Sequence, residues 1–283
     1  MKKKVLVLVA DDNYIEHCKA VIHSAVTVGK WDGDIRVIVP LGTTLPSDFK
    51  HEVFEVEMHT TENRYNKFFL FHEYFNQWDW IFYTDLDVLF IDKIELDLEK
   101  RDTRYLYANP DGNKDIQYQY KIRLWELKNM MDFVTSAVHS PGQIALRTGW
   151  LDLLNLKPNQ QAFQSCFMLF NRRLIATKTF RRLIDAAWSL NPFVKFEDQG
   201  IFNTVLHDKW KPLSNKFENR CPVLDQIDWH YHKIHEVDGH WDRNEYEDMC
   251  AIHFFRYFTP WMPQNKKWYP VYREHLEGYE QLF

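Results

Sequence analysis

Hydrophobic residues of this chain gather in short apolar runs that alternate with stretches of helical spacing. Val5–Ala10 is an unbroken aliphatic run, and Tyr14–Val28 carries apolar side chains three and four positions apart, which predicts a strand followed by a helix. Strands that alternate with helices indicate βαβ units, so we expect an α/β fold with a mainly parallel central sheet and helices on both faces. The same patterns predict further strands at Ile35–Val39, Val53–Val56, Trp80–Thr84, Tyr105–Ala108 and Ser165–Phe170, and helices at Leu45–His51, Arg64–Phe75, Leu174–Leu190 and Asp198–Leu206.

The chain contains no internal repeat, low-complexity tract or Gly/Ser-rich linker that would divide it. We therefore expect a single domain over residues 1–283, with a helical tail at 263–283. Of its 283 residues, 45% are hydrophobic and only 9 are glycine. This composition excludes disordered and fibrous proteins.

The charge of the chain is mild, with 35 basic and 40 acidic residues and a formal net charge of -5 at pH 7. Because Lys and Arg are spread along the chain, the basic patch of a nucleic-acid-binding protein is missing, and we expect no nucleic-acid partner. Aromatic residues make up 16% of the chain. Most of them belong in a Phe-rich core. Aromatic residues in excess of what the core requires often line sugar or nucleoside sites.

Cysteine usage and the terminal segments indicate the compartment. The four cysteines form no Cys-x-x-Cys pair, so we expect a reducing, cytoplasmic environment. The lysines at the N-terminus precede an apolar run that stops at Asp11 without a cleavage site, which favours a first strand over a signal peptide. No apolar stretch reaches the roughly 18 residues that span a bilayer. The basic and aromatic segment 266–283 suggests at most a peripheral membrane contact.

Two acids, Asp85 and Asp87, interrupt the very apolar segment 80–90. Burying carboxylates in such surroundings is costly unless a cation receives them. At a strand end, where the chain turns, carboxylates two positions apart can both reach one divalent ion through their oxygens. The pattern therefore favours a metal site, and the alternative is a pair of surface acids in a turn.

His253 follows the apolar pair Ala251–Ile252 near the C-terminus. A histidine in this setting is more often a hydrogen-bonded core residue than a ligand. Combined with the two acids, its imidazole would complete a set of two oxygens and one nitrogen, which suits Mn²⁺ better than Mg²⁺. The histidines at 230, 232, 235 and 240 lie at no strong zinc spacing from a cysteine or an acid, so we expect no structural zinc.

Five segments of the chain occur in the order typical of one enzyme family. They are Ala10–Tyr14 (ADDNY), Tyr83–Leu89 (YTDLDVL), Phe163–Asn171 (FQSCFMLFN), Asp198–Asn203 (DQGIFN) and His253–Trp261 (HFFRYFTPW). Together they resemble glycosyltransferase family 8, which includes bacterial lipopolysaccharide galactosyl- and glucosyltransferases and the glycogenins. The order and spacing of the blocks, which extend over nearly the whole chain, carry the resemblance.

The resemblance implies a GT-A nucleotide-diphospho-sugar transferase fold, with a nucleotide-binding half at 1–100 and an acceptor and catalytic half at 101–262. It also implies an activity, that of a metal-dependent, retaining hexosyltransferase of glycan biosynthesis. Such an enzyme moves glucose or galactose from a UDP-sugar to a glycan or another hydroxyl acceptor. The implied cofactor is Mn²⁺, with Mg²⁺ as the alternative, bound at the Asp-x-Asp (DxD) motif.

Position by position, the resemblance implies which residues contact the donor. Asp11 would accept a hydrogen bond from the uracil, Asn13 would hold the ribose region, and Tyr14 would stack on the base. Lys67 sits where the family has an Arg or Lys that contacts the donor. Asp85 would lie beside the diphosphate of the UDP-sugar.

The resemblance also implies the metal ligands and the catalytic pair. Asp85, Asp87 and His253 match the family's metal ligands, and a metal held there can neutralise the charge that builds on a diphosphate leaving group. Asp198 and Gln199 match the acidic and amide pair beside the sugar, with Gln199 near the reacting face. Since Gln199 is a poor nucleophile, we expect attack from the leaving-group face, with Asp198 orienting the donor hydroxyls.

Three positions depart from the family pattern. The family's small, Gly-containing segment reads Gln164–Cys166 here, which changes the contacts around the donor sugar or the acceptor. Arg256 and Thr259 stand where the family usually has a Gly and a Lys that faces the diphosphate. Arg256 would supply this charge to the donor from the Gly position. The alternative is a solvated Arg, with weaker donor binding or activity.

Two other classes of function stay open. Asp85–Val88 (DLDV) aligns with the DxDx[TV] motif of haloacid-dehalogenase-like phosphatases, in which Asp85 would be a phosphorylated nucleophile. The later Lys and the paired acidic motif of those enzymes have no counterpart that we can place. The other alternative is a nucleotide-sugar-binding protein that kept the fold and lost catalysis, which Thr259 would allow.

Overall fold

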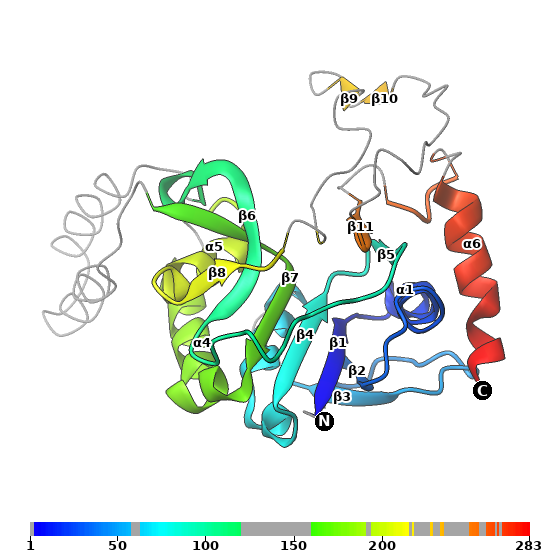
Figure 1. Cartoon of the computed structure of the whole chain (residues 1–283), viewed down its shortest axis with the longest axis horizontal. Coiled ribbons are helices and arrows are strands. Elements are labelled where there is room, and N and C mark those ends of the chain that lie inside the picture. The colour runs from blue at the N-terminus through cyan, green and yellow to red at the C-terminus, as the bar shows by residue number, and fades with distance from the viewer. Residues whose placement is uncertain are drawn as a thin grey trace, which may run out of the picture. The chain divides into compact units, whose positions relative to one another are not determined.

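The computed structural model describes residues 3–57, 63–119, 160–190, 194–214, 217, 227–228, 233–234, 249–254, 259–263, 265 and 268–283 (Figure 1). The chain divides into two compact units, of which unit 1 comprises residues 1–57, 82–101 and 213–283, and unit 2 comprises residues 58–81 and 102–212. The single domain expected over residues 1–283 stays a prediction. No helix in the described ranges is long and apolar enough to cross a membrane.

Seven strands form the main sheet in the order β3-β2-β1-β4-β7-β6-β8. β1 pairs in parallel with β2, β2 with β3, and β6 with β8, whereas β6 and β7 are antiparallel. The prediction of an α/β fold with a mainly parallel central sheet flanked by helices is confirmed. The strand bounds are Lys4–Val9 for β1, Asp34–Pro40 for β2, Glu52–Val56 for β3, Trp80–Thr84 for β4, Leu106–Asp115 for β6, Gln161–Asn171 for β7 and Trp210–Pro212 for β8.

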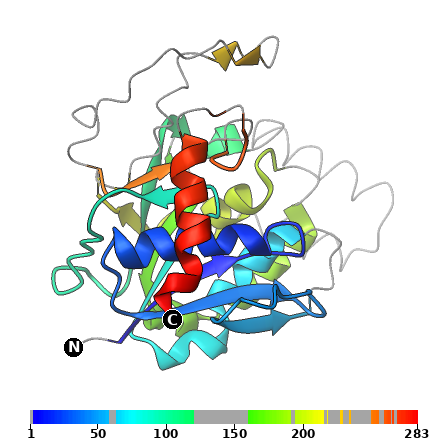
Figure 2. The same ribbon diagram turned by 90° about the vertical axis from the view of Figure 1, so that its right-hand side faces the viewer.

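The core of unit 1 forms around β1, in which Val5–Leu8 are completely buried. A strand covered on both faces needs apolar residues at successive positions, and this requirement explains the unbroken aliphatic run. The helix α1 (Ile15–Thr27) follows, with its apolar residues buried at helical spacing. The C-terminal helix α6 (Trp268–Gly278) crosses α1 and packs against it (Figure 2). A peripheral membrane contact of segment 266–283 gains no support from this arrangement.

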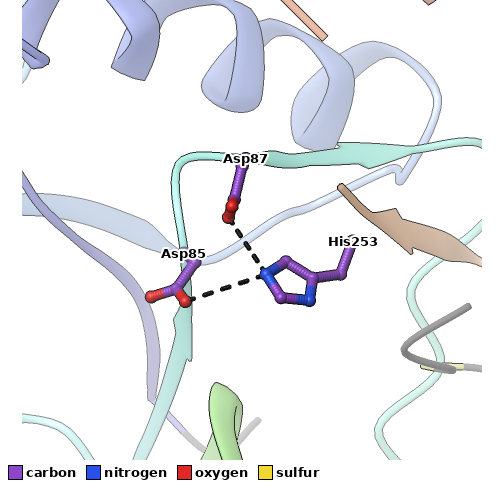
Figure 3. A group of neighbouring side chains, drawn as sticks. All are labelled: Asp85, Asp87 and His253. Atoms are coloured by element: carbon purple, nitrogen blue, oxygen red, sulfur yellow. Dashed lines mark ion pairs between the residues drawn. The ribbon is translucent and has the colours of Figure 1, made fainter. Parts of the chain in front are cut away.

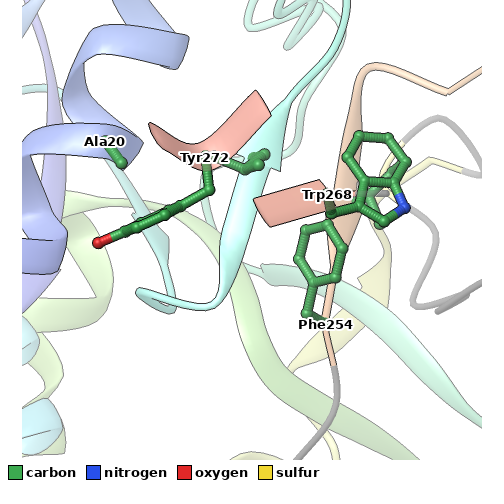
Figure 4. Close-up of a cluster of buried hydrophobic side chains, with 6 residues drawn as sticks. Ala20, Phe254, Trp268 and Tyr272 are labelled. Carbon is green, nitrogen blue, oxygen red and sulfur yellow. The ribbon is translucent and has the colours of Figure 1, made fainter. Parts of the chain in front are cut away.

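A cluster of buried side chains anchors α6 within unit 1 (Figure 4). The cluster joins α1 and α6 to the antiparallel pair formed by β5 (Val88–Phe90) and β11 (Ala251–His253). Trp268 packs edge-on against Phe254 with the ring centroids 5.3 Å apart, a geometry that adds to the energy of burial. The buried members are Ala20, Leu89, Ile252, Phe254, Trp268 and Tyr272.

In unit 2 the helix α5 (Glu197–Leu206) contacts β7, and the helix α4 (Thr179–Leu190) packs against α5. Asn203 of α5 ties the helix to the strand through its carboxamide. The Asn203 side-chain oxygen accepts from the Phe163 N–H at 2.8 Å, and its nitrogen donates to the Phe163 carbonyl at 2.7 Å. Because Asn203 is completely buried, this reciprocal pair holds α5 on β7 away from competing water.

The helix predicted at Leu45–His51 does not form. Only a single turn closes there, when the Phe49 N–H donates to the Pro46 carbonyl at 2.9 Å. The carboxylate of Asp48 instead contacts the buried ammonium group of Lys19 on α1, at 2.6 Å. A buried charge needs an opposite charge, and this tertiary requirement outweighs a weak local helix propensity.

Two other predicted helices are interrupted. The segment Arg64–Phe75 forms the 3₁₀ helices η1 (Asn63–Phe71) and η2 (Glu73–Gln77), because His72 is extended and its ring accepts from the Tyr74 N–H. The second interruption divides the segment 174–190. Lys178 there adopts a left-handed conformation with φ 60°, between the 3₁₀ helix η4 (Arg172–Thr177) and α4. Threonine hydroxyls on both sides of it donate to the Leu174 carbonyl, which satisfies the end of η4.

The contact between α1 and α6 encloses a pair of histidines. Nδ1 of His23 lies 2.9 Å from Nδ1 of His275, so one ring donates and the other accepts. Gly278 permits this approach, because a Cβ at that position would lie 2.6 Å from His23 Nε2. Burial, followed by the charge of His23, lowers the pKa of His275 to about 4. Burial also lowers the pKa of His23, against the opposite effect of Glu274.

We expect this histidine pair to make the fold sensitive to acid. Unfolded histidine takes up a proton near pH 6.5, whereas folded His275 stays neutral down to about pH 4. The unfolded state therefore binds more protons in this window, and the free energy of unfolding should fall as the pH decreases, by an amount on the order of 3 kcal/mol. Thermal melts should show a shallower pH slope for His275→Gln than for the wild type, and an equal slope would contradict the assignment.

Candidate functional site

Asp85 and Asp87 lie in the turn between β4 and β5, where a completely buried strand ends. β5 pairs with β11 in a register that places Val88 opposite His253. One further hydrogen bond extends the pairing, since the Phe254 N–H donates to the Asp87 carbonyl at 2.7 Å. This short ladder brings His253 to the acidic turn from a distant part of the sequence.

The side chains of Asp85, Asp87 and His253 converge (Figure 3). Nε2 of His253 lies 3.1 Å from Asp87 Oδ1 and 3.9 Å from Asp85 Oδ2. One ligand atom from each residue lies within 4.8 Å of the other two. The other oxygen of Asp85 accepts a hydrogen bond from the Tyr83 hydroxyl, which orients the carboxylate. The histidine is buried and both acids are partly exposed, so the group is anchored on one side and accessible on the other.

The atoms that these side chains offer fit a hard divalent ion. Two carboxylate oxygens with one imidazole nitrogen suit Mn²⁺, and the set lacks the thiolates of a typical structural zinc site. Carboxylates this close repel each other unless a cation or a protonated histidine lies beside them. The structure thus brings together the three residues that the sequence singled out as a metal set. Ion binding at these residues stays a prediction.

The loop after β1 holds the residues predicted to contact the nucleotide. Asp11 shapes this loop, because its carboxylate accepts from the Asn13 N–H at 2.9 Å. Tyr14 is 45% exposed, so part of this residue is accessible to a ligand. The ring of Trp261 lies edge-on to Tyr14, with centroids 6.2 Å apart. Asp11, Asn13 and Tyr14 therefore share one exposed loop, and their nucleotide contacts stay predictions.

The sequence did not predict the aromatic packing behind Tyr14. Trp261 stacks on His17 with centroids 4.1 Å apart and planes 10° apart. Nδ1 of His17 in turn bonds to the Tyr272 hydroxyl at 2.5 Å. Burial lowers the pKa of His17, which favours the neutral ring. The available signal was the spacing of His17, one helical turn after Tyr14.

Unit 2 gathers the remaining described site residues, Lys67, Asp198 and Gln199. Nζ of Lys67 lies 3.0 Å from Asp198 Oδ2, with only 17% and 13% of the two side chains exposed. The Ser165 hydroxyl donates to the same oxygen at 3.1 Å. One oxygen of Asp198 thus contacts the ammonium group of Lys67 on η1 and the hydroxyl of Ser165 on β7. Ser165 belongs to the segment in which the chain departs from the family pattern.

Gln199 belongs to a group of side-chain amides that the sequence did not predict. Its amide nitrogen donates to Asp111 Oδ2 and to Gln119 Oε1, each at 3.1 Å. Gln164 donates to Asp111 Oδ1, also at 3.1 Å. The available signal was the run of polar residues that directly follows the apolar strand Tyr105–Ala108. Asp111 is thus a further candidate site residue in unit 2.

Arg256 lies outside the described residues, as do the histidines at 230, 232, 235 and 240. Thr259 is described and buried, and its hydroxyl has no hydrogen-bond partner within the described part of the chain. The roles that the resemblance implies for Arg256 and Thr259 therefore stay predictions.

Comparisons with known proteins give a match only at the level of structure. No family model matches the sequence, and no curated protein matches it. The galactosyltransferase LgtC in complex with donor and acceptor sugar analogs superposes with a TM-score of 0.58 and 13% identity, over 97% of this chain and 95% of that chain. An active-site mutant of LgtC gives a TM-score of 0.62 and 14% identity over the same shares of the two chains.

Two larger glycosyltransferases are also similar. The bifunctional enzyme WbbM has a TM-score of 0.60 and 16% identity over 97% of this chain, which spans only 50% of WbbM. GlyE from Streptococcus pneumoniae TIGR4 has a TM-score of 0.55 and 15% identity, over 100% of this chain and 64% of GlyE. At these identities the likeness shows the fold alone. The chain therefore has the GT-A glycosyltransferase fold, as expected from the sequence.

Proposed function

We propose that this protein is a retaining hexosyltransferase that moves glucose or galactose from a UDP-sugar to a glycan or another hydroxyl acceptor with the help of Mn²⁺. The observation that carries the proposal is the convergence of Asp85, Asp87 and His253 at the end of a buried strand. The fold supports it, because the similar solved structures are glycosyltransferases and one is described as bound to donor and acceptor sugar analogs.

Asp85, Asp87 and His253 would hold the ion. A bound divalent cation supplies charge neutralisation for the diphosphate that leaves when the glycosyl bond breaks. Tyr83 keeps the Asp85 carboxylate oriented, and the pairing of β5 with β11 keeps His253 in place. A neutralised diphosphate needs no proton from a side-chain acid in order to leave.

The loop after β1 would bind the uridine. Asp11 would accept from the uracil, Asn13 would contact the ribose, and Tyr14 would stack on the base. Trp261 and His17 pack behind Tyr14 and limit the rotation of its ring. A ring that is already oriented loses less conformational freedom on binding, so this packing favours the nucleotide complex.

Asp198 and Gln199 would act on the sugar. Lys67 and Ser165 both contact one oxygen of Asp198, so its other oxygen can accept a hydrogen bond from a donor hydroxyl. Gln199 is an amide and a poor nucleophile, which disfavours a covalent intermediate. Attack from the leaving-group face then gives retention, with a phosphate oxygen taking the proton of the acceptor hydroxyl. Arg256 would add a cation near the diphosphate.

The two alternatives make different predictions. A haloacid-dehalogenase-like phosphatase would use Asp85 as a nucleophile, and the GT-A fold removes the structural basis for that alignment. A protein that binds a nucleotide-sugar without catalysis is favoured by one observation, the buried hydroxyl of Thr259 at the position of the family's lysine. That alternative predicts binding of UDP and Mn²⁺ without turnover.

UDP and Mn²⁺ together should stabilise the protein far more than either does alone, because the ion connects the acidic turn to the diphosphate. At ligand concentrations about 100 times the dissociation constant, the gain in unfolding free energy is about 2.7 kcal/mol. A thermal-shift assay should show this joint effect in the wild type. Asp87→Asn and His253→Ala should lose it while melting cooperatively.

Asp97 offers a matched control for these substitutions. It is exposed in unit 1 and has a positive φ of 47°, which asparagine tolerates well. Asp97→Asn removes the same charge as Asp87→Asn and should keep the joint shift. Equal stabilisation by UDP in the presence of a chelator would contradict the metal assignment, as would a full shift in Asp87→Asn.

UDP-glucose or UDP-galactose should be hydrolysed or transferred in a reaction that requires Mn²⁺. Loss of one electrostatic contact to developing charge costs about 100-fold or more in kcat, and we expect at least this loss in Asp87→Asn. NMR of the glycosyl product should show the anomeric configuration of the donor.

Other results of this assay would favour other mechanisms. An inverted product would exclude attack from the leaving-group face. Intact binding of UDP and Mn²⁺ without any turnover would favour the binding protein. Mg²⁺-dependent hydrolysis of a simple phosphate ester, lost in Asp85→Asn, would favour the phosphatase.

A further inference from the structure

Asp111 is a buried carboxylate surrounded by side-chain amides. It is 3% exposed and lies on β6. Its Oδ2 accepts from Gln119 at 3.0 Å and from Gln199 at 3.1 Å, and its Oδ1 accepts from Gln164 at 3.1 Å. Gln119, on the 3₁₀ helix η3 (Ile116–Gln119), is itself completely buried. These four side chains, which we name the amide cluster, all belong to unit 2.

The chemistry of the carboxylate decides which way each amide points. An ionised carboxylate only accepts hydrogen bonds, so every amide that contacts Asp111 must turn its nitrogen toward it. Gln119 does so through Nε2, which leaves its Oε1 to accept from Gln199 at 3.1 Å. Both N–H groups of Gln199 are therefore used, one on Asp111 and one on Gln119.

The carbonyl oxygen of Gln199 is consequently fixed on the opposite side of its amide group. The Ser165 N–H approaches this oxygen at 3.4 Å, which is a long hydrogen bond. A carbonyl oxygen has two lone pairs, and the described residues supply no second donor to it. Gln199 is also partly exposed, so this oxygen is able to contact a ligand. The amide cluster therefore leaves the side-chain oxygen of Gln199 available as a hydrogen-bond acceptor for a ligand, whereas both of its N–H groups are already used.

Backbone contacts hold the cluster in place. The Gln119 carbonyl accepts from the Lys195 N–H at 2.7 Å, just before α5 begins. The main-chain carbonyl of Gln199, on α5, accepts from the Asn203 carboxamide at 2.9 Å. Asn203 also pairs with the backbone of Phe163 on β7. The helix that carries Gln199 is therefore connected to β7, and the segment just before this helix is connected to η3, which carries Gln119.

We infer that Asp111 and Gln119 are positioning residues that fix the Gln199 carboxamide with its carbonyl oxygen toward the donor sugar. This inference rests on the proposed function, in which Gln199 lies near the reacting face. An oxygen dipole there stabilises positive charge on the sugar ring as the bond to the diphosphate breaks. An amide turned the other way would place N–H groups there and oppose that charge.

The geometry of the cluster is tested without any substrate. Gln199→Glu places a second carboxylate beside Asp111, and like charges at this distance disfavour joint ionisation. We measure the difference in melting temperature between this variant and the wild type at each pH. As the pH rises from 5 to 8, the variant should lose about 5 °C relative to the wild type. Adding Asp111→Asn should restore it, because an asparagine amide donates to the new carboxylate.

Gln281→Glu is the matched control, since it introduces the same charge at an exposed position in unit 1. It should follow the wild-type melting temperature at every pH. A Gln199→Glu variant that also follows the wild type would overturn the inference, because the two side chains would then not be in contact.

The positioning role is tested by kinetics with UDP-glucose and UDP-galactose in the presence of Mn²⁺. Gln119→Met removes the oxygen that holds Gln199 and keeps a side chain of similar length. We expect kcat to fall about 100-fold, as for a misplaced catalytic group, with KM and the joint UDP and Mn²⁺ thermal shift unchanged. In a Gln199→Ala background, Gln119→Met should have no further effect on kcat.

Independent losses in the two variants, which multiply in the double variant, would overturn the inference, as would an unchanged kcat in Gln119→Met. Absence of turnover in the wild type contradicts the proposed function instead. The melting series of Gln199→Glu still decides in that case whether the amide cluster exists as described.

Discussion

The pairing of β5 with β11 is the contact on which the proposed metal site depends. The acids at the end of β4 are neighbours in the sequence, but His253 reaches them only because Val88 lies opposite it in this ladder. The pair is held by apolar burial, since Leu89 and Ile252 both belong to the cluster beneath α6. Burial of such side chains stabilises by about 2 kcal/mol each. Hydrophobic packing therefore brings the three polar side chains together.

The acidic side chains of the two units differ in their burial and in the groups that they contact. The acids of unit 1 are partly exposed and converge on a single imidazole, an arrangement that a cation would stabilise. In unit 2, the carboxylate of Asp111 is buried and receives three neutral amides.

Patterns of apolar residues predicted α1 and the strands of five or more residues, because buried strands such as Val5–Leu8 leave an uninterrupted aliphatic signal. The shorter strands, β5 and β11 among them, were not predicted. The helix predicted at Leu45–His51 failed for a tertiary reason, since the buried Lys19 requires Asp48 as a partner. The break at Lys178 depends on hydroxyl groups that a periodic pattern does not register.

The candidate site could be predicted in part. Asp85, Asp87 and His253 were singled out from the residue types themselves and again by the resemblance of ordered motifs, and the structure brings them together. Asp111 and Gln119 escaped prediction because their importance lies in contacts with Gln199 across 88 and 80 positions of the chain. No local pattern encodes a hydrogen bond between side chains so far apart.

The distance along the chain between β5 and β11 also has a consequence for folding. Closing so long a loop lowers the conformational entropy of the chain before any favourable contact forms. Contacts between segments so far apart therefore tend to form late. Early in folding, the acidic turn therefore forms without its histidine, and a metal ion would find only part of its ligands there. During synthesis on the ribosome, the proposed site comes into being only after the segment around His253 has been made.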